Sequence, residues 1–130
     1  ALCLADSLLC CGKLDGLDLR HRFWAWWKYG YNNAFGRGAM RPKERNSIGL
    51  GTNISKSLDE WEYDPEHRTQ FTRIGDEHTS SNGSLMRNAP VPVWFHRDLE
   101  AGLTAAYQQS KTTHQGEEAA ELCRLLTFIC

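Results

Sequence analysis

The chain has 130 residues, of which 41% are hydrophobic, and its 15 basic and 16 acidic residues give a formal net charge of −1. This length accommodates one domain with a sizeable core. The near-neutral charge disfavours nucleic acid and anionic membranes as partners, since both select a basic face, and no stretch approaches the ~18 apolar residues of a membrane span.

The first 31 residues predict two helices. Residues 1–11 are mostly apolar and predict a buried helix that ends at Gly12. Asp15 or Asp18 is expected to cap a second helix that runs to about Tyr29. Its apolar stripe consists of Leu19, Phe23, Trp26, Trp27 and Tyr31. Because the spacing is helical and the charge is balanced, we interpret these aromatic residues as core and not as a base-stacking platform.

The middle of the chain alternates between loop and helix patterns. Residues 32–49 contain three glycines and several basic residues, and they predict a solvated loop; binding of a polyanion is the alternative. Thr52 or Asn53 is expected to cap the next helix. The helical spacing there is carried by Ile54, Leu58 and Trp61. Residues 62–81 are polar and without a period, which predicts a long surface connection of the kind that is often functional.

The last third predicts three helices. A short helix is expected within 82–91, and a longer one from an Asp98 cap to about Ser110. A final helix begins after His114, with acidic residues in its first turn. The prolines expected to break the short helix are Pro90 and Pro92, and the inward-facing residues of the longer one are Leu99, Leu103, Ala106 and Tyr107. Two-residue alternation is absent throughout, so the predicted fold class is all-α.

The five cysteines form an odd set without the close spacing of a zinc site. They are Cys3, Cys10, Cys11, Cys123 and Cys130. The seven-residue spacing within the first and last pairs predicts one buried helix face for each pair. We expect reduced, packed thiols in a cytoplasmic protein.

The most informative segment is the polar turn at residues 80–84, followed by Met86-Arg87 and, one helix later, by Thr112-Thr113-His114. A glycine-containing turn and a helix start supply unpaired N–H groups and positive dipole ends, which favour a phosphate or pyrophosphate. The alternative is an ordinary helix cap made by Asn82 or Ser84. Arg87 is expected to pair with a phosphate or an acidic side chain, and His114 to contact either a ligand or local backbone.

Two further segments are weaker candidates. The turn at residues 49–53 is also glycine-rich and leads into a helix, so the two turns are able to face one ligand from opposite sides; a simple tight turn is the alternative. Asp76, Glu77 and His78 form the one candidate catalytic cluster in a loop, but the cluster is too generic to identify a reaction.

Five segments give the chain a resemblance to the ADP-ribosylglycohydrolase family, which includes the dinitrogenase-reductase-activating glycohydrolase. They are residues 1–8 (Ala-Leu-Cys-Leu-Ala-Asp-Ser-Leu), 27–31 (Trp-Lys-Tyr-Gly-Tyr), 49–58, 82–90 (Asn-Gly-Ser-Leu-Met-Arg-Asn-Ala-Pro) and 112–114 (Thr-Thr-His). The resemblance implies an all-α domain that binds two magnesium ions and ADP-ribosylated protein or a related ADP-ribose conjugate. It also implies hydrolysis of the glycosidic bond between ADP-ribose and an arginine-type acceptor.

The resemblance also implies which residues of this sequence bind the ligand, because they stand at the family's ligand-binding positions. Gly51 would lie near the phosphates, and His114 would contact the ligand. The residues implied to line the ADP-ribose pocket are Ser81, Asn82, Gly83 and Ser84.

The sequence also departs from the family pattern. Ser81 stands where the family usually has glycine, and the Thr-Asp-Asp and Asp-x-Asp-Thr words that hold magnesium are absent. Both ends fall within apolar patterns, which predicts that residues 1–130 are the central portion of a single domain truncated at both ends. Metal ligands and catalytic residues are therefore expected outside this chain, and the isolated chain is expected to be inactive. The alternative is a non-catalytic relative, either crystallin-like or ADP-ribose-binding.

Overall fold

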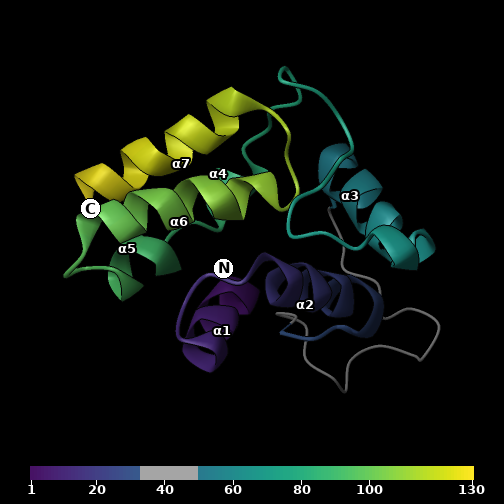
Figure 1. The fold of residues 1–130 in the computed structure, drawn as a ribbon, viewed down its shortest axis with the longest axis horizontal. Helices are drawn as coiled ribbons and strands as arrows, with labels where there is room; N and C mark the ends of the chain where they lie inside the picture. The colour runs from purple at the N-terminus through teal and green to yellow at the C-terminus, as the bar shows by residue number, and fades with distance from the viewer. Residues whose placement is uncertain (33–49) are drawn as a thin grey trace.

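The structure, a computed structural model, describes residues 1–32 and 50–130, so the predicted loop at 32–49 lies almost wholly outside the described residues. The described part contains helices and no strand, which confirms the all-α prediction. The antiparallel helices α6 (Leu99–Lys111) and α7 (Glu117–Ile129) lie side by side, opposite α1 (Leu2–Cys11) and α2 (Gly16–Tyr29) (Figure 1). The remaining elements are α3 (Thr52–Tyr63), the 3₁₀ turn η1 (Pro65–His67), α4 (Gly83–Met86) and α5 (Pro90–Trp94).

Local sequence signals explain several of the helix ends. Gly12 ends α1 with φ of 69°, a left-handed conformation that glycine adopts without steric cost. Asp15 caps α2, because its carboxylate accepts hydrogen bonds from the backbone N–H groups of Leu17 and Asp18 at 3.0 Å. Asp98 caps α6 in the same way. These three predictions are confirmed, and Asp15 rather than Asp18 is the cap of α2.

Three local predictions are wrong. Gly51 is the N-cap of α3, so Thr52 and Asn53 lie inside its first turn and are not caps. Pro90 and Pro92 do not break a helix; α5 begins at Pro90, because a proline needs no N–H partner in the first turn. Leu99 was expected to face inward but is 49% exposed at the very start of α6.

The core joins the two helix pairs. Its buried apolar side chains are Cys3, Leu4, Leu8, Leu19, Phe23, Leu58, Val91, Ala105, Ala106 and Cys123. Trp26, Trp27 and Tyr31 pack against it while half-buried, which confirms the core interpretation of the aromatic stripe. No described helix has the length and apolar character needed to cross a membrane.

The cysteines divide by position along their helices. All five are free. Cys3 and Cys123 are buried, but Cys10 and Cys130 are exposed, so neither seven-residue pair shares a buried face. Cys10 lies in the last turn of α1 and Cys130 follows the end of α7, where the core no longer covers the helix.

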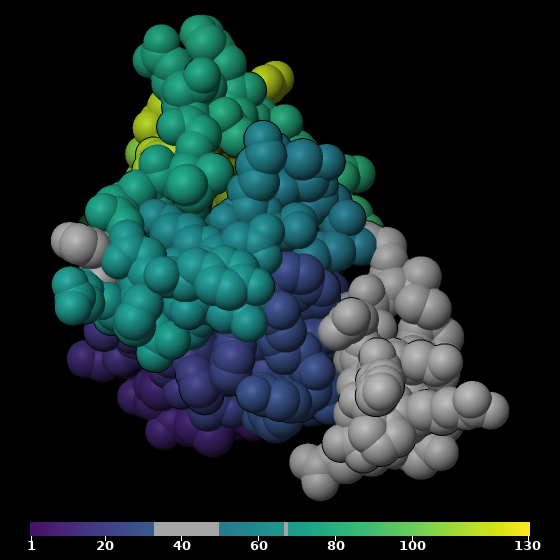
Figure 2. All heavy atoms as spheres, turned by 90° about the vertical axis from the view of Figure 1, so that its right-hand side faces the viewer, coloured from purple at the N-terminus to yellow at the C-terminus, as the bar shows by residue number. Residues whose placement is uncertain are grey.

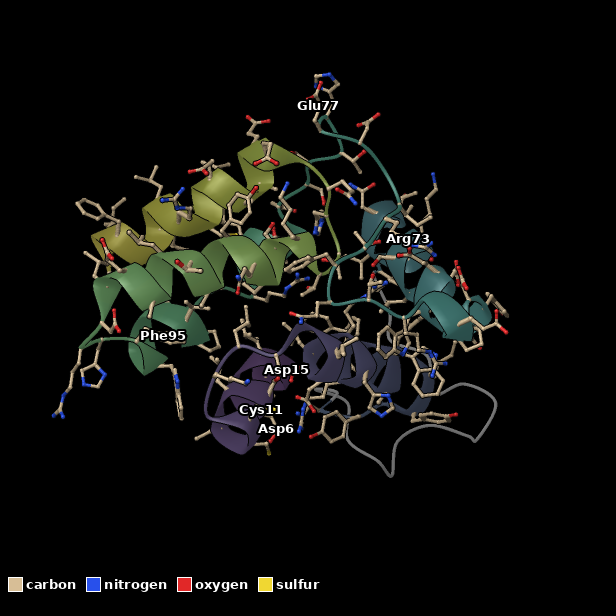
Figure 3. The ribbon with its side chains drawn as sticks, in the orientation of Figure 1. Asp6, Cys11, Asp15, Arg73, Glu77 and Phe95 are labelled. Carbon is tan, nitrogen blue, oxygen red and sulfur yellow. The ribbon has the colours of Figure 1, made fainter. Side chains whose placement is uncertain are left out.

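The connection after α3 is pinned by a buried arginine. Arg20 of α2 donates hydrogen bonds to the carbonyl oxygens of Thr69 and Phe71 at 3.0 Å and to the Glu60 carboxylate of α3 at 2.9 Å. Figure 2 shows α3 and this connection lying against α2 on one face of the molecule. Arg73 continues the same contact by pairing with Glu60 at 3.0 Å, beside α3 in Figure 3. The predicted surface connection is therefore fixed to two helices.

Candidate ligand-binding cavity

A cavity of about 770 Å³ opens between α1, α2, the start of α3 and the segment that holds α4. Its volume falls within the roughly 300–1,000 Å³ that small-molecule sites occupy. The cavity is lined by described residues from both predicted turns, namely 50–54 and 81–83. The two turns, separated by almost thirty residues of sequence, therefore share one space, an arrangement that the sequence left open beside a simple tight turn at residues 49–53.

The start of α3 supplies the positive end of a helix to this cavity. Its cap, Gly51, has no side chain and therefore makes no side-chain hydrogen bond to the first turn of α3. The N–H groups of that turn are therefore left without an intrahelical partner, and the helix dipole adds partial positive charge there. A β-carbon at Gly51 would meet no atom within 4 Å, so the space in front of the cap is open.

Residues 81–83 form the opposite wall, and Ser84 does not. Asn82 occupies the N-cap position of α4, but its side chain makes no capping hydrogen bond. Ser84 is fully buried, and its hydroxyl lies 2.8 Å from the hydroxyl of Ser110. The alternative that either side chain caps α4 is therefore wrong, and Ser84 contacts α6 instead of lining the cavity.

His114 lies directly behind the cavity wall. It is fully buried in the connection between α6 and α7 and is absent from the cavity lining. Its Nε2 is 2.7 Å from the Ser81 hydroxyl, and its Nδ1 is 2.8 Å from the Thr113 hydroxyl. A β-carbon on Gly83 would lie 2.8 Å from Cδ1 of Ile54 and 3.3 Å from the His114 ring, so this wall packs tightly against both side chains. Burial, helped by the nearby Arg87 charge, lowers the pKa of His114 to about 4, so its imidazole is neutral at pH 7.

Arg87 lies at the base of the cavity and is 6% exposed. Its Nε donates to the side-chain oxygen of Gln109 at 2.8 Å, and its Nη2 donates to the Gln109 carbonyl at 2.7 Å and the Thr113 hydroxyl at 2.8 Å. The guanidinium carbon also lies 4.5 Å from the centre of the Phe23 ring. Burial lowers the pKa of Arg87 to about 10, which leaves it charged at pH 7. Within residues 1–32 and 50–130 its partners are thus amide, carbonyl and hydroxyl groups, and the expected acidic partner is wrong.

Apolar side chains supply much of the remaining lining, and the sequence did not single out the aromatic ones, Phe23 and Trp26, as part of a site. The apolar lining residues are Leu2, Cys3, Phe23, Trp26, Leu50, Ile54 and Met86. Phe23 and Trp26 were expected only in the core. Their helical spacing predicted burial, but no sequence signal separates an aromatic ring in the core from one that borders a cavity.

The acidic turn at residues 76–78 lies away from this cavity. Asp76 accepts hydrogen bonds from the His78 N–H and the Thr79 hydroxyl, so it stabilises the turn itself. Glu77 and His78 are largely exposed, and Glu77 stands at the tip of a projecting loop in Figure 3. Across the described residues, no group of three His, Cys, Asp or Glu side chains is placed to hold a metal ion.

Comparison with known proteins adds an independent finding. The family model for ADP-ribosylglycohydrolase matches residues 1–130. The chain is 26% identical to the ADP-ribosylarginine hydrolase Tri1 of Serratia proteamaculans (strain 568) over 129 residues, which is 99% of this chain and 32% of that protein. It is 28% identical to the ADP-ribosylarginine hydrolase Tri1 of Pseudomonas putida (strain GB-1) over 135 residues, covering 97% of this chain and 31% of that protein. The chain therefore spans about a third of the length of these curated relatives.

Proposed function

The chain belongs to the ADP-ribosylglycohydrolase family, and we propose that it forms the ADP-ribose-binding part of a hydrolase that removes ADP-ribose from arginine side chains. The cavity is the observation that carries this proposal. It combines the positive start of α3 and the Arg87 guanidinium with the aromatic rings of Phe23 and Trp26. A diphosphate needs the first two groups, and a flat base needs an apolar wall.

The acceptor is the second part of the proposal. Both relatives are named ADP-ribosylarginine hydrolases, so arginine is the acceptor that we propose for this protein too. The macromolecular partner is then an ADP-ribosylated protein. The five free thiols favour a reducing compartment, and we propose the cytoplasm.

Magnesium does not fit the described residues. The resemblance implies a pair of these ions, and hard cations require several oxygen ligands. The part of the chain that the structure describes offers no group of three candidate ligands. In this proposal the described residues bind and orient the ligand, and any magnesium is held by other residues of the protein.

Gly51 offers a direct test, because it lines the cavity and a side chain there would enter open space. In the complete protein, Gly51→Trp is expected to abolish ADP-ribose binding, measured by isothermal titration calorimetry. Gly51→Ser is the matched control, since serine is a good N-cap residue and adds little bulk. Equal affinity in the two variants would exclude the cavity as the binding site.

Release of ADP-ribose from an ADP-ribosylated arginine peptide, with magnesium and with EDTA, tests the reaction separately. Hydrolysis that requires magnesium supports the proposal. Binding without any release would make the protein a non-catalytic ADP-ribose-binding relative.

A further inference from the structure

Four polar side chains form a continuous line from the base of the cavity to its rim. Arg87 Nη2 lies 2.8 Å from the Thr113 hydroxyl, and that hydroxyl lies 2.8 Å from His114 Nδ1. On the other side of the ring, His114 Nε2 lies 2.7 Å from the Ser81 hydroxyl. The first three residues are buried, whereas Ser81 is exposed and lines the cavity. The line therefore links a buried charge to a hydroxyl that a ligand is able to reach.

The direction of each hydrogen bond follows from the first donor. A guanidinium has no acceptor, so the Thr113 oxygen must accept from Arg87. The Thr113 hydroxyl hydrogen then needs an acceptor of its own, and within the described residues His114 Nδ1 is the acceptor in reach. Leaving a buried hydroxyl without one costs about 1–3 kcal/mol. Thr113 therefore donates to Nδ1, which must carry a lone pair.

A neutral imidazole with a lone pair on Nδ1 carries its hydrogen on Nε2. His114 then donates to the Ser81 oxygen, and the Ser81 hydroxyl hydrogen is left without a protein acceptor among the described residues. We infer that Arg87, acting through Thr113, fixes the Nε2–H tautomer of His114 and thereby makes the Ser81 hydroxyl a hydrogen-bond donor directed into the cavity. Arg87, Thr113 and His114 are positioning residues in this arrangement, and Ser81 is the residue that touches the ligand.

This arrangement gives the rim a chemical preference. A hydroxyl that already accepts from His114 and donates outward selects a ligand oxygen with lone pairs, such as a phosphate or carbonyl oxygen, over a ligand N–H group. The inference rests on the proposed function only in naming ADP-ribose as that ligand. The tautomer of His114 follows from the protein alone.

The tautomer is measurable without any ligand. In the complete protein with ¹⁵N-labelled histidine, the ring nitrogen shifts and couplings of His114 are expected to show hydrogen on Nε2 and a bare Nδ1 at pH 7. The signals are assigned by their loss in His114→Gln. Hydrogen on Nδ1, or an equal mixture of tautomers, would overturn the inference whether or not the protein binds ADP-ribose.

Affinity for ADP-ribose tests the outward donor. Ser81→Ala is expected to weaken binding about tenfold, the loss of one hydrogen bond to a charged oxygen. Thr113→Val is expected to weaken binding several-fold, because the ring is no longer held. Thr112→Val is the matched control. The Thr112 hydroxyl also accepts from Arg87 Nη2, at 3.2 Å, but it donates to the Gln109 carbonyl and not to the His114 ring, so binding should change less than twofold.

A double-mutant cycle tests whether Thr113 affects binding through His114 and Ser81 or by a separate structural effect. If Ser81 and Thr113 act through His114, the double variant is expected to bind about as weakly as Ser81→Ala alone. Fully additive losses would show that the two hydroxyls act independently and would refute the inference. If the unaltered protein binds no ADP-ribose, the proposed function fails while the tautomer measurement still decides this inference.

Discussion

Lowering the pH from 7 to 5 is expected to destabilise the folded protein through His114. Free histidine has a pKa of about 6.5, whereas burial beside the Arg87 charge lowers the pKa of His114 to about 4. Between these two values the unfolded chain binds a proton that the folded chain does not. Stability therefore falls as the pH falls through this window, and it is fully present above pH 6.5.

The size of the effect follows from the two pKa values. A shift of about 2.5 pKa units corresponds to about 3 kcal/mol when the window has been crossed completely, at about 1.4 kcal/mol per unit. By pH 5 about 2 kcal/mol of this has been lost, because free histidine is then almost fully protonated and His114 is still neutral. Such a loss is a large fraction of the stability of a typical domain.

Urea unfolding followed by tryptophan fluorescence at pH 7, 6 and 5 measures this loss. The comparison is with His114→Gln, whose neutral amide does not titrate. Carboxylates contribute equally to both proteins, so the difference between their losses isolates His114. The unaltered protein is expected to lose about 2 kcal/mol more than the variant. Equal losses, with unchanged dependence on urea concentration, would refute the argument that His114 is buried in the neutral form.

Two further substitutions test how the connections are held. Glu60→Gln leaves the buried Arg20 without its charged partner, and we expect it to lower the free energy of unfolding in urea by about 3–5 kcal/mol. Glu121→Gln breaks an exposed ion pair and is the control, with an expected loss of less than about 1 kcal/mol. Gly116→Ala would place a β-carbon 2.7 Å from a backbone carbonyl oxygen, so we expect a fall in Tm of several degrees, the equivalent of about 1–3 kcal/mol. Gly51→Ser, which puts a good N-cap residue into open space, should change Tm little.

Local rules explain what the sequence predicted correctly. The ends of α1 and α2 depend on Gly12 and Asp15, whose effects reach only two or three residues along the chain. The same locality explains the errors at α3, where Thr52 and Asn53 looked like better caps than Gly51. Capping preferences differ by fractions of a kcal/mol between good candidates, so contacts elsewhere in the fold decide the boundary.

The contacts that shape the cavity lie beyond local rules. Ser81 and His114 meet across 33 residues, and Arg87 meets Gln109 and Thr113 across 22 and 26 residues. The motif around 82–90 indicated a ligand site, but only the fold shows that the buried Arg87 side chain lies at the base of the cavity. Ser84 shows where prediction from a motif fails. Neighbouring residues in a helix point to different sides, so Ser84, which directly follows the cavity-lining Gly83, faces the interior and contacts Ser110.

Buried polar side chains are the common means by which this protein holds its loops. Arg20 fixes the connection after α3 through backbone carbonyls, and Arg87 fixes the connection between α6 and α7 through Gln109 and Thr113. A loop presents backbone groups that apolar packing leaves unsatisfied, so an arginine with five N–H donors is an effective partner for it. The desolvation of each guanidinium opposes folding, but the gain is a fixed loop geometry. For Arg87 that geometry includes Ser81 and the cavity rim, so the same contact that stabilises the fold also positions the proposed binding site.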